Sequence, residues 1–174
     1  MTRKFSSFYL ILLLVGLISC EKENTDTASK ISVSKYIQLL KSDNYQAGTL
    51  PAFTAEDIPA LLAYRNETEL ISNFPGNPIS SAHVPECKLG MYVLWTIESI
   101  RAVSIDSKYL IQRFPSQTPT LTLRNATELK LVKDDLSHQI AAKAYLEWWE
   151  TNKTQNFNLF SNIDPLANTA YRWH

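Results

Sequence analysis

The sequence contains none of the patterns by which several classes of enzyme are recognised. It has three histidines, His83, His138 and His174, and none belongs to a His-Glu-x-x-His motif or to another paired metal spacing. We therefore expect no metal site and no other cofactor. Residues 32–35 spell Ser-x-x-Lys, the nucleophile motif of penicillin-binding folds, but the companion Ser-Asp-Asn and Lys-Thr-Gly motifs are missing. The sequence thus favours a non-catalytic role, with an enzyme of unrecognised type as the alternative.

An excess of positive charge and a membrane-length apolar run are also absent. The chain has 17 basic and 17 acidic residues and a formal net charge of zero, so we expect no nucleic-acid partner. The apolar run from Phe8 to Ile18 is about half of the ~20 residues that a transmembrane helix needs. Because Arg3 and Lys4 precede this run, the pattern is typical of a cleaved signal peptide, which we place at residues 1–19.

The sequence has only two cysteines, Cys20 and Cys87. Cys20 follows Leu17-Ile18-Ser19, which resembles the bacterial lipobox, a leucine three places before a cysteine with small or modest residues between. The resemblance implies that Cys20 receives a thioether-linked diacylglycerol and becomes the mature N-terminus. An ordinary secretory signal followed by a chance cysteine is the alternative. With Cys20 acylated, Cys87 is the only free thiol, no intramolecular disulfide can form, and burial is expected to protect it.

A polar segment follows the lipobox and is predicted to be a tether over residues 20–31. Glu21 to Lys30 is acidic and has no large apolar side chain. Acidic residues after the cysteine resemble the surface-export signal of Bacteroides-type lipoproteins, although Lys22 interrupts the acidic cluster. The resemblance implies an outer-membrane lipoprotein that faces the medium, or otherwise the periplasm. The triplet that ends at Ala28 also resembles the O-glycosylation acceptor of those bacteria, which would make Thr27 the attachment point.

Residues 32–174 are predicted to form a single helical domain. Apolar periodicity indicates four helices, in the ranges 34–42, 58–67, 85–103 and 127–152. The third helix is apolar nearly all round, and a helix with so little polar surface is buried on most sides. Its expected core residues are Cys87, Met91, Trp95 and Ile97. The fourth helix carries one predicted apolar stripe, formed by Leu129, Val132, Leu136, Ile140 and Ala144.

The predicted fold class is all-α, a small irregular helical bundle with two Pro-rich ordered loops. The loops are "FPGNPISSAHVP" and "FPSQTPTLTLR", and the "TLTLR" part of the second alternates like a strand but has no evident partner. Leu-Ile-x-x-Phe-Pro occurs at Leu70 and again at Leu110, a spacing of 40 residues. Because HEAT and armadillo helical repeats have periods near ~40, a divergent helical repeat is a second interpretation of the same residues.

Three charged or titratable side chains on the predicted helices are candidates for a site. Glu98 and Arg101 are three residues apart on the apolar helix, so we expect them to pair with each other or with another charge, or else to line a pocket. His138 follows two aspartates on one helix, which could raise its pKa, although a solvated helix face is favoured. A cleft around Glu98, Arg101 or His138 would indicate a small envelope hydrolase.

Aromatic residues gather on the fourth helix and near His174. Tyr145, Trp148 and Trp149 lie within one helical turn, and residues 171–174 spell Tyr-Arg-Trp-His. Rings of this kind serve interfaces and stack on sugars, although more often they are core. We take Tyr145, Trp149 and Trp173 as candidate binding residues, and we expect the C-terminal aromatic tail to dock on the helix.

Residues 34–174 resemble a small family of Bacteroides-type lipoproteins described as domain of unknown function 4943. The resemblance rests on "FTAEDIPALLAYRNE", "FPGNPISS", "ECKLGMYVLWTIESIRA", "HQIAAKAYLEWW" and "YRWH". It implies kinship but assigns no chemistry. The sequence as a whole therefore predicts a lipid-anchored cell-envelope protein, a non-catalytic binding or scaffolding module for a protein or glycan at the outer membrane, with the small hydrolase as the alternative.

Overall fold

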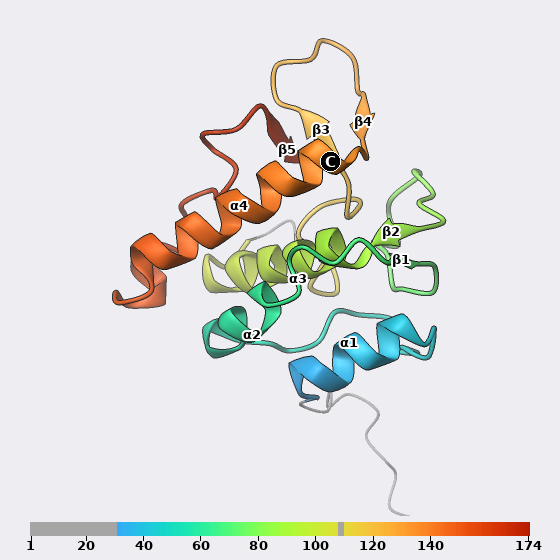
Figure 1. Ribbon diagram of the computed structural model, residues 1–174, viewed down its shortest axis with the longest axis horizontal. Helices are drawn as coiled ribbons and strands as arrows, with labels where there is room; N and C mark the ends of the chain where they lie inside the picture. Colours follow the sequence, from blue (N-terminus) through green and yellow to red (C-terminus); the bar gives the residue numbers. More distant parts are fainter. Residues whose placement is uncertain (1–30, 108–109) are drawn as a thin grey trace, which may run out of the picture.

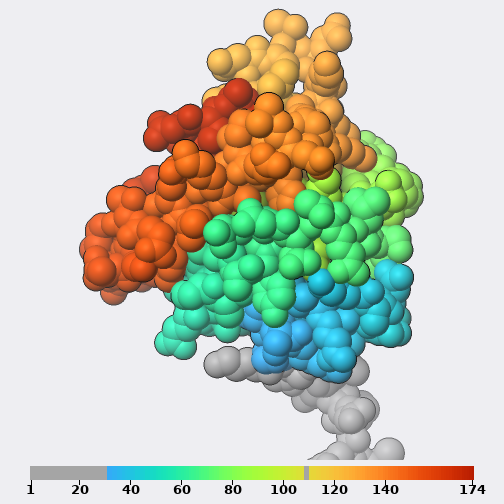
Figure 2. Space-filling model, viewed as in Figure 1, coloured from blue at the N-terminus to red at the C-terminus, as the bar shows by residue number. Residues whose placement is uncertain are grey.

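The computed structural model describes residues 31–107 and 110–174. The predictions for the signal peptide, for Cys20 and for Thr27 lie outside the described residues. Helix α3 (Leu89–Ser104) runs through the middle of the domain. Helices α1 (Val33–Lys41) and α2 (Ile58–Leu62) lie on one side of it, and α4 (Asp135–Asn152) lies on the other (Figure 1). In the space-filling view α3 is almost hidden behind its neighbours (Figure 2).

Helices α1 and α2 begin where the sequence provides capping groups. Ser32 precedes α1, and its hydroxyl accepts a hydrogen bond from the Lys35 amide at 3.2 Å. A short 3-10 helix, η1 (Ala55–Asp57), leads into α2, and Thr54 and Asp57 form a capping box there. Pro59 lies in the first turn of α2, where it removes no helical hydrogen bond. These caps fix where both helices start.

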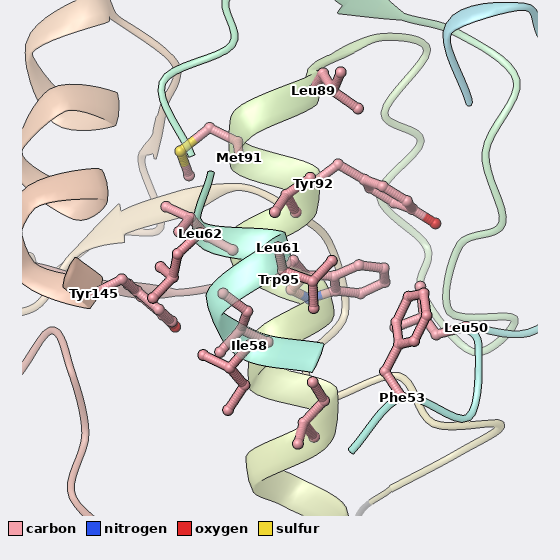
Figure 3. Close-up of a cluster of buried hydrophobic side chains, with 14 of the residues drawn as sticks. Leu50, Phe53, Ile58, Leu61, Leu62, Leu89, Met91, Tyr92, Trp95 and Tyr145 are labelled. Carbon is pink, nitrogen blue, oxygen red and sulfur yellow. The ribbon is translucent and has the colours of Figure 1, made fainter. Parts of the chain in front are cut away.

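Burial of α3 on almost all sides confirms the expectation from its apolar sequence. Cys87, Met91, Trp95 and Ile97 are all in the core. Ile58 and Leu61 of α2 pack against the side of α3 that carries Trp95 (Figure 3). The Trp95 indole also donates from Nε1 to the Ser116 hydroxyl at 2.8 Å, so its one polar atom is satisfied inside the core.

The predicted all-α class is wrong, because the described residues include two antiparallel sheets. Strand β1 (Leu70–Ile71) pairs with β2 (Cys87–Lys88), which occupies the first part of the predicted third helix. Strand β3 (Leu121–Leu123) lies between β4 (Leu131–Val132) and β5 (Tyr171–Trp173). The alternating "TLTLR" segment thus has two partners, and one of them is about fifty residues away along the chain. Local periodicity cannot indicate so distant a partner.

The helical-repeat interpretation is also wrong, because the two copies of the six-residue pattern fold differently. Leu70 and Ile71 of the first copy form β1. In the second copy, Ile111 and Phe114 form an isolated β-bridge around a tight turn. The turn residues Gln112 and Arg113 have positive φ values of 48° and 67°. The first copy leads through an irregular Pro-rich loop to β2 and α3, whereas the second leads to β3.

Helix α4 begins later than predicted and buries a different face. Asp134 is its N-cap and accepts from the Ser137 amide at 2.8 Å, so the helix starts at Asp135 rather than near residue 127. Leu129 and Leu136 of the predicted stripe are 63% and 62% exposed. The buried side chains are instead Ser137, His138, Ala141, Ala142, Tyr145 and Trp148. Small alanines let α4 approach α3 closely, and the larger leucines face outward.

Among residues 31–107 and 110–174, no helix combines the length and hydropathy that a membrane crossing requires. Within the same residues, no three histidine, cysteine or acidic side chains are arranged to share a metal ion.

Candidate functional site

Four side chains singled out from the sequence meet in one hydrogen-bonded cluster between α3, α4 and β5. Nη1 of Arg101 donates to the Glu98 carboxylate and lies 2.6 Å from each of its oxygens. The Tyr145 hydroxyl donates to Oε1 of the same carboxylate. Nε1 of Trp173 donates to the Tyr145 oxygen at 2.8 Å. We call Glu98, Arg101, Tyr145 and Trp173 the Glu98 cluster. It joins two helices to the C-terminal strand.

The polar groups of the Glu98 cluster are hydrogen-bonded to one another and are largely shielded from solvent. The side chains of Arg101 and Glu98 are only 8% and 13% exposed. Burial is the largest single influence on the pKa of Arg101 and would lower it, but the Glu98 charge, the hydrogen bond to Glu98 and other nearby groups together outweigh burial, so the pKa is raised. Burial also raises the pKa of Tyr145 well above its ordinary value, and the Glu98 charge adds to this. Because both carboxylate oxygens are engaged, the geometry suits a structural role better than general acid–base chemistry.

The three candidate binding aromatics differ in how much surface they offer. Tyr145 is completely buried inside the Glu98 cluster. Trp173 is half-buried, and its ring lies edge-on to Tyr145 with the centroids 6.4 Å apart. Trp149 is half-buried and packs against Phe160, with 6.1 Å between the ring centroids. The C-terminal aromatic segment thus docks on α4, and only part of each tryptophan ring reaches the surface.

His138 is buried rather than on the solvated face that the sequence favoured. Its ring is 3% exposed, and Nε2 lies 2.8 Å from the backbone oxygen of Arg65. A carbonyl oxygen only accepts, so Nε2 carries the proton. Burial lowers the pKa of His138, and the hydrogen bond to Arg65 offsets only part of that shift. The ring is therefore neutral at neutral pH and ties α4 to the segment after α2. The two preceding aspartates instead cap α4 and pair with Lys88.

The His138 ring also borders a cavity of about 140 Å³, which we call the Met91 pocket. Its lining includes Cys87, Lys88, Met91, Val132, Lys133 and His138. Burial raises the pKa of the Cys87 thiol to about 12, despite the opposing effect of Lys133 and Lys88. A thiol with that pKa stays protonated at neutral pH, so the geometry does not favour Cys87 as a nucleophile beside His138.

A larger concavity follows α4 and was not predicted from the sequence. This α4 groove lies between the helix and residues 163–169 and has a volume of about 430 Å³. Its lining includes Glu147, Trp148 and Thr151 from the helix and Ile163, Asp164 and Asn168 from the facing segment. The two walls are separated along the chain, and neither contains a recognised motif. Only the tertiary fold brings these side chains together.

Some polar groups in the walls of the α4 groove are held by hydrogen bonds within the protein, and others have no such partner among the described residues. Asp164 is held in place by Arg124 Nη2 at 2.9 Å and by the Leu166 amide at 2.8 Å. Asn168 is exposed, and its side chain forms no hydrogen bond with any described residue. Trp148 is 6% exposed, and its Nε1 is buried without a hydrogen-bond partner in the part of the chain that the structure describes, so this atom does not reach the groove. A few polar groups beside apolar carbon are typical of ligand sites.

The fold and its concavities define a small mixed helix-and-sheet domain with a polar groove along one helix. A family model described as Domain of unknown function (DUF4943) matches residues 27–174. Because this match covers most of the chain, the protein belongs to that family. No curated protein matches the sequence, and neither does any solved structure.

Proposed function

We propose that the protein is a lipid-anchored cell-envelope binding module that holds a glycan chain in the α4 groove. The observation that carries the proposal is the lining of that groove. Glu147, Thr151 and Asn168 supply hydrogen-bonding groups around apolar carbon from Ile163 and Trp148. Sugar rings present hydroxyls that donate and accept, together with apolar C–H faces, so they match such a mixed surface. The volume of about 430 Å³ is in the range of small-ligand sites.

The rest of the molecule supports binding over hydrolysis. The Glu98 carboxylate is already bonded by Arg101 and Tyr145. His138 is held by a backbone carbonyl. A hydrolase would need a base and a nucleophile that converge on a free position. The candidates named from the sequence are instead engaged with the protein itself, and the groove that remains is lined by hydrogen-bonding side chains.

Replacing Asn168 with alanine should weaken glycan binding about tenfold, because one hydrogen bond to the ligand is lost. The exposed side chain makes no bond within the described domain, so the fold should be unaffected. Binding would be measured with the full chain against a panel of neutral and acidic oligosaccharides. Asn162→Ala is the matched control, because Asn162 is exposed on the same segment but does not line the groove. If the groove instead captures a peptide, or if both variants bind equally, the glycan assignment fails.

The anchor part of the proposal rests on the lipobox-like residues before Cys20 and on the acidic tether after it. Two or three acyl chains would hold the protein stably to a bilayer, at ~0.8 kcal/mol per buried methylene. We propose that the domain faces the medium from the outer membrane, as in Bacteroides-type lipoproteins, and that Thr27 in the tether carries an O-glycan. Both modification sites fall outside the residues that the structure describes.

Mass spectrometry of the N-terminal peptide should find acyl chains on Cys20, and protease added to intact cells should digest the domain. A Cys20→Ala variant should lose the chains and leave the membrane fraction. A peptide mass that includes a hexose-containing adduct, lost in Thr27→Ala, would support glycosylation. An acylated but protected domain would contradict the surface orientation, and an unacylated peptide would contradict the anchor.

A further inference from the structure

The Met91 pocket is a second concavity that shares no lining residue with the α4 groove. Met91, Cys87 and Val132 give it an apolar interior. The Met91 side chain leaves α3 on the side away from Tyr92 and points toward α4 (Figure 3). The cavity of about 140 Å³ is close to the ~150 Å³ of an engineered protein cavity that binds benzene. It therefore has room for a ligand body of about six carbon atoms.

Two ammonium groups, those of Lys88 and Lys133, border this pocket. Lys88 is 16% exposed, pairs with Asp135 and donates to the Lys133 carbonyl at 3.4 Å. The Lys133 side chain forms no ion pair with any residue in the described ranges. Both ammonium groups act on the Cys87 thiol, where they oppose the effect of burial on its pKa. A carboxylate placed beside Lys133 would be attracted to its ammonium group.

The carboxylates of Glu86 and Asp134 also line the pocket, and that of Asp135 pairs with Lys88. The Asp134 carboxylate is engaged as the N-cap of α4 and accepts from the Ser137 amide. Asp135 is already paired with Lys88. Glu86 and Lys133 are both exposed at the rim, so solvent and salt screen both of their charges. The neutral His138 ring adds no charge. Lys133 is therefore left as the group available to an anion.

We propose that the Met91 pocket binds a small carboxylate with an apolar body of about six carbons. The body lies against Met91 and Cys87, and the carboxylate lies at the Lys133 ammonium. Benzoate and hexanoate are the matching probes, and benzyl alcohol and benzylamine have similar bodies without the negative charge. A ligand of this size binds with a Kd on the order of 1 mM. This site is independent of the glycan proposal for the α4 groove.

Methionine-methyl NMR offers a direct test, because the chain contains only Met1 and Met91. The full chain labelled with ¹³C at the methionine methyl groups would be titrated with each of the four probes. The Met91 signal, assigned by its loss in Met91→Leu, should shift saturably with benzoate and hexanoate. Benzyl alcohol and benzylamine should shift it much less at equal concentration. No saturable shift with benzoate, or an equal shift with benzylamine, would overturn the proposal.

Two lysine variants at the β3–β4 hairpin separate the contribution of the proposed ion pair to binding from the contribution of the apolar cavity. Lys133→Gln should weaken benzoate about fivefold and leave the weak effect of benzyl alcohol unchanged. Lys130→Gln is the matched control, because Lys130 is exposed on the same hairpin but does not line the pocket. Its benzoate titration should match that of the unaltered protein. If both lysine variants lower the benzoate affinity equally, the assignment of the carboxylate to Lys133 fails.

Discussion

Arg101→Met should lower the free energy of unfolding by about 3–5 kcal/mol. Arg101 is buried, and its loss leaves the Glu98 carboxylate without its counter-charge inside the domain. It also removes the hydrogen bond from Arg101 Nε to the Ser161 carbonyl at 2.9 Å, which ties α3 to the segment after α4. Urea unfolding followed by tryptophan fluorescence would measure the loss. Arg172→Met is the control, because Arg172 is exposed, and it should change stability by less than about 0.5 kcal/mol.

A double variant tests whether the unpaired charge, rather than lost packing, causes this destabilisation. Glu98→Leu combined with Arg101→Met removes both charges of the pair, so it should be more stable than Arg101→Met alone. Tyr145 would lose its acceptor but keep the bond from Trp173. If the double variant loses the sum of the two single effects, the pair is not coupled and the interpretation of the Glu98 cluster as an ion-pair network is wrong.

Gly90→Ala should destabilise the protein by about 3 kcal/mol, although alanine is ordinarily the better helix former by ~1 kcal/mol. A Cβ at this position would lie 2.5 Å from the Arg65 carbonyl oxygen and 2.6 Å from His138 Nε2. These two atoms form the hydrogen bond that joins α4 to the segment after α2. Since neither a backbone carbonyl nor a buried ring can move freely, the helices must separate. Thermal unfolding would measure the effect.

Gly76→Ala provides the contrast, because nothing lies within 4 Å of a Cβ built at Gly76 and its φ is not positive. The same substitution there should be neutral, or should stabilise the protein by ~0.4–1 kcal/mol because alanine reduces the conformational entropy of the unfolded chain. Equal effects at Gly76 and Gly90 would mean that the close approach of α3 and α4 tolerates a methyl group.

Features that depend on one stretch of sequence could be predicted, and features that depend on distant partners could not. The uniform apolar character of α3 indicated its burial, and the apolar periodicity of residues 34–42 indicated α1. By contrast, strands of two or three residues carry little periodicity. The sequence therefore indicated β3 only as an alternating segment with no evident pairing partner. The hydropathy of Leu129 and Leu136 led to the wrong buried face of α4, because the contact includes a histidine that periodicity did not place there.

The candidate site likewise combines features that one stretch of sequence predicts with features that depend on distant partners. The spacing of Glu98 and Arg101 was enough to expect a charge pair, whereas its link to Tyr145 and Trp173 depends on the docking of β5. The two walls of the α4 groove are joined only by the tertiary fold. His138 was expected on a solvated face because two aspartates precede it, but those aspartates interact at the helix start and leave the ring free to turn inward.

The position of β5 also has a consequence for how the protein is made. Strand β3 pairs with residues 171–173, and Trp173 completes the Glu98 cluster. Chains are synthesised from the N-terminus at ~5–20 residues per second, so residues 121–123 emerge from the ribosome seconds before this partner exists. During that interval β3 has an unpaired edge, and Tyr145 lacks one of its hydrogen bonds. The hydrogen bonds of β3 and of the Glu98 cluster are therefore complete only after residue 173 has been translated.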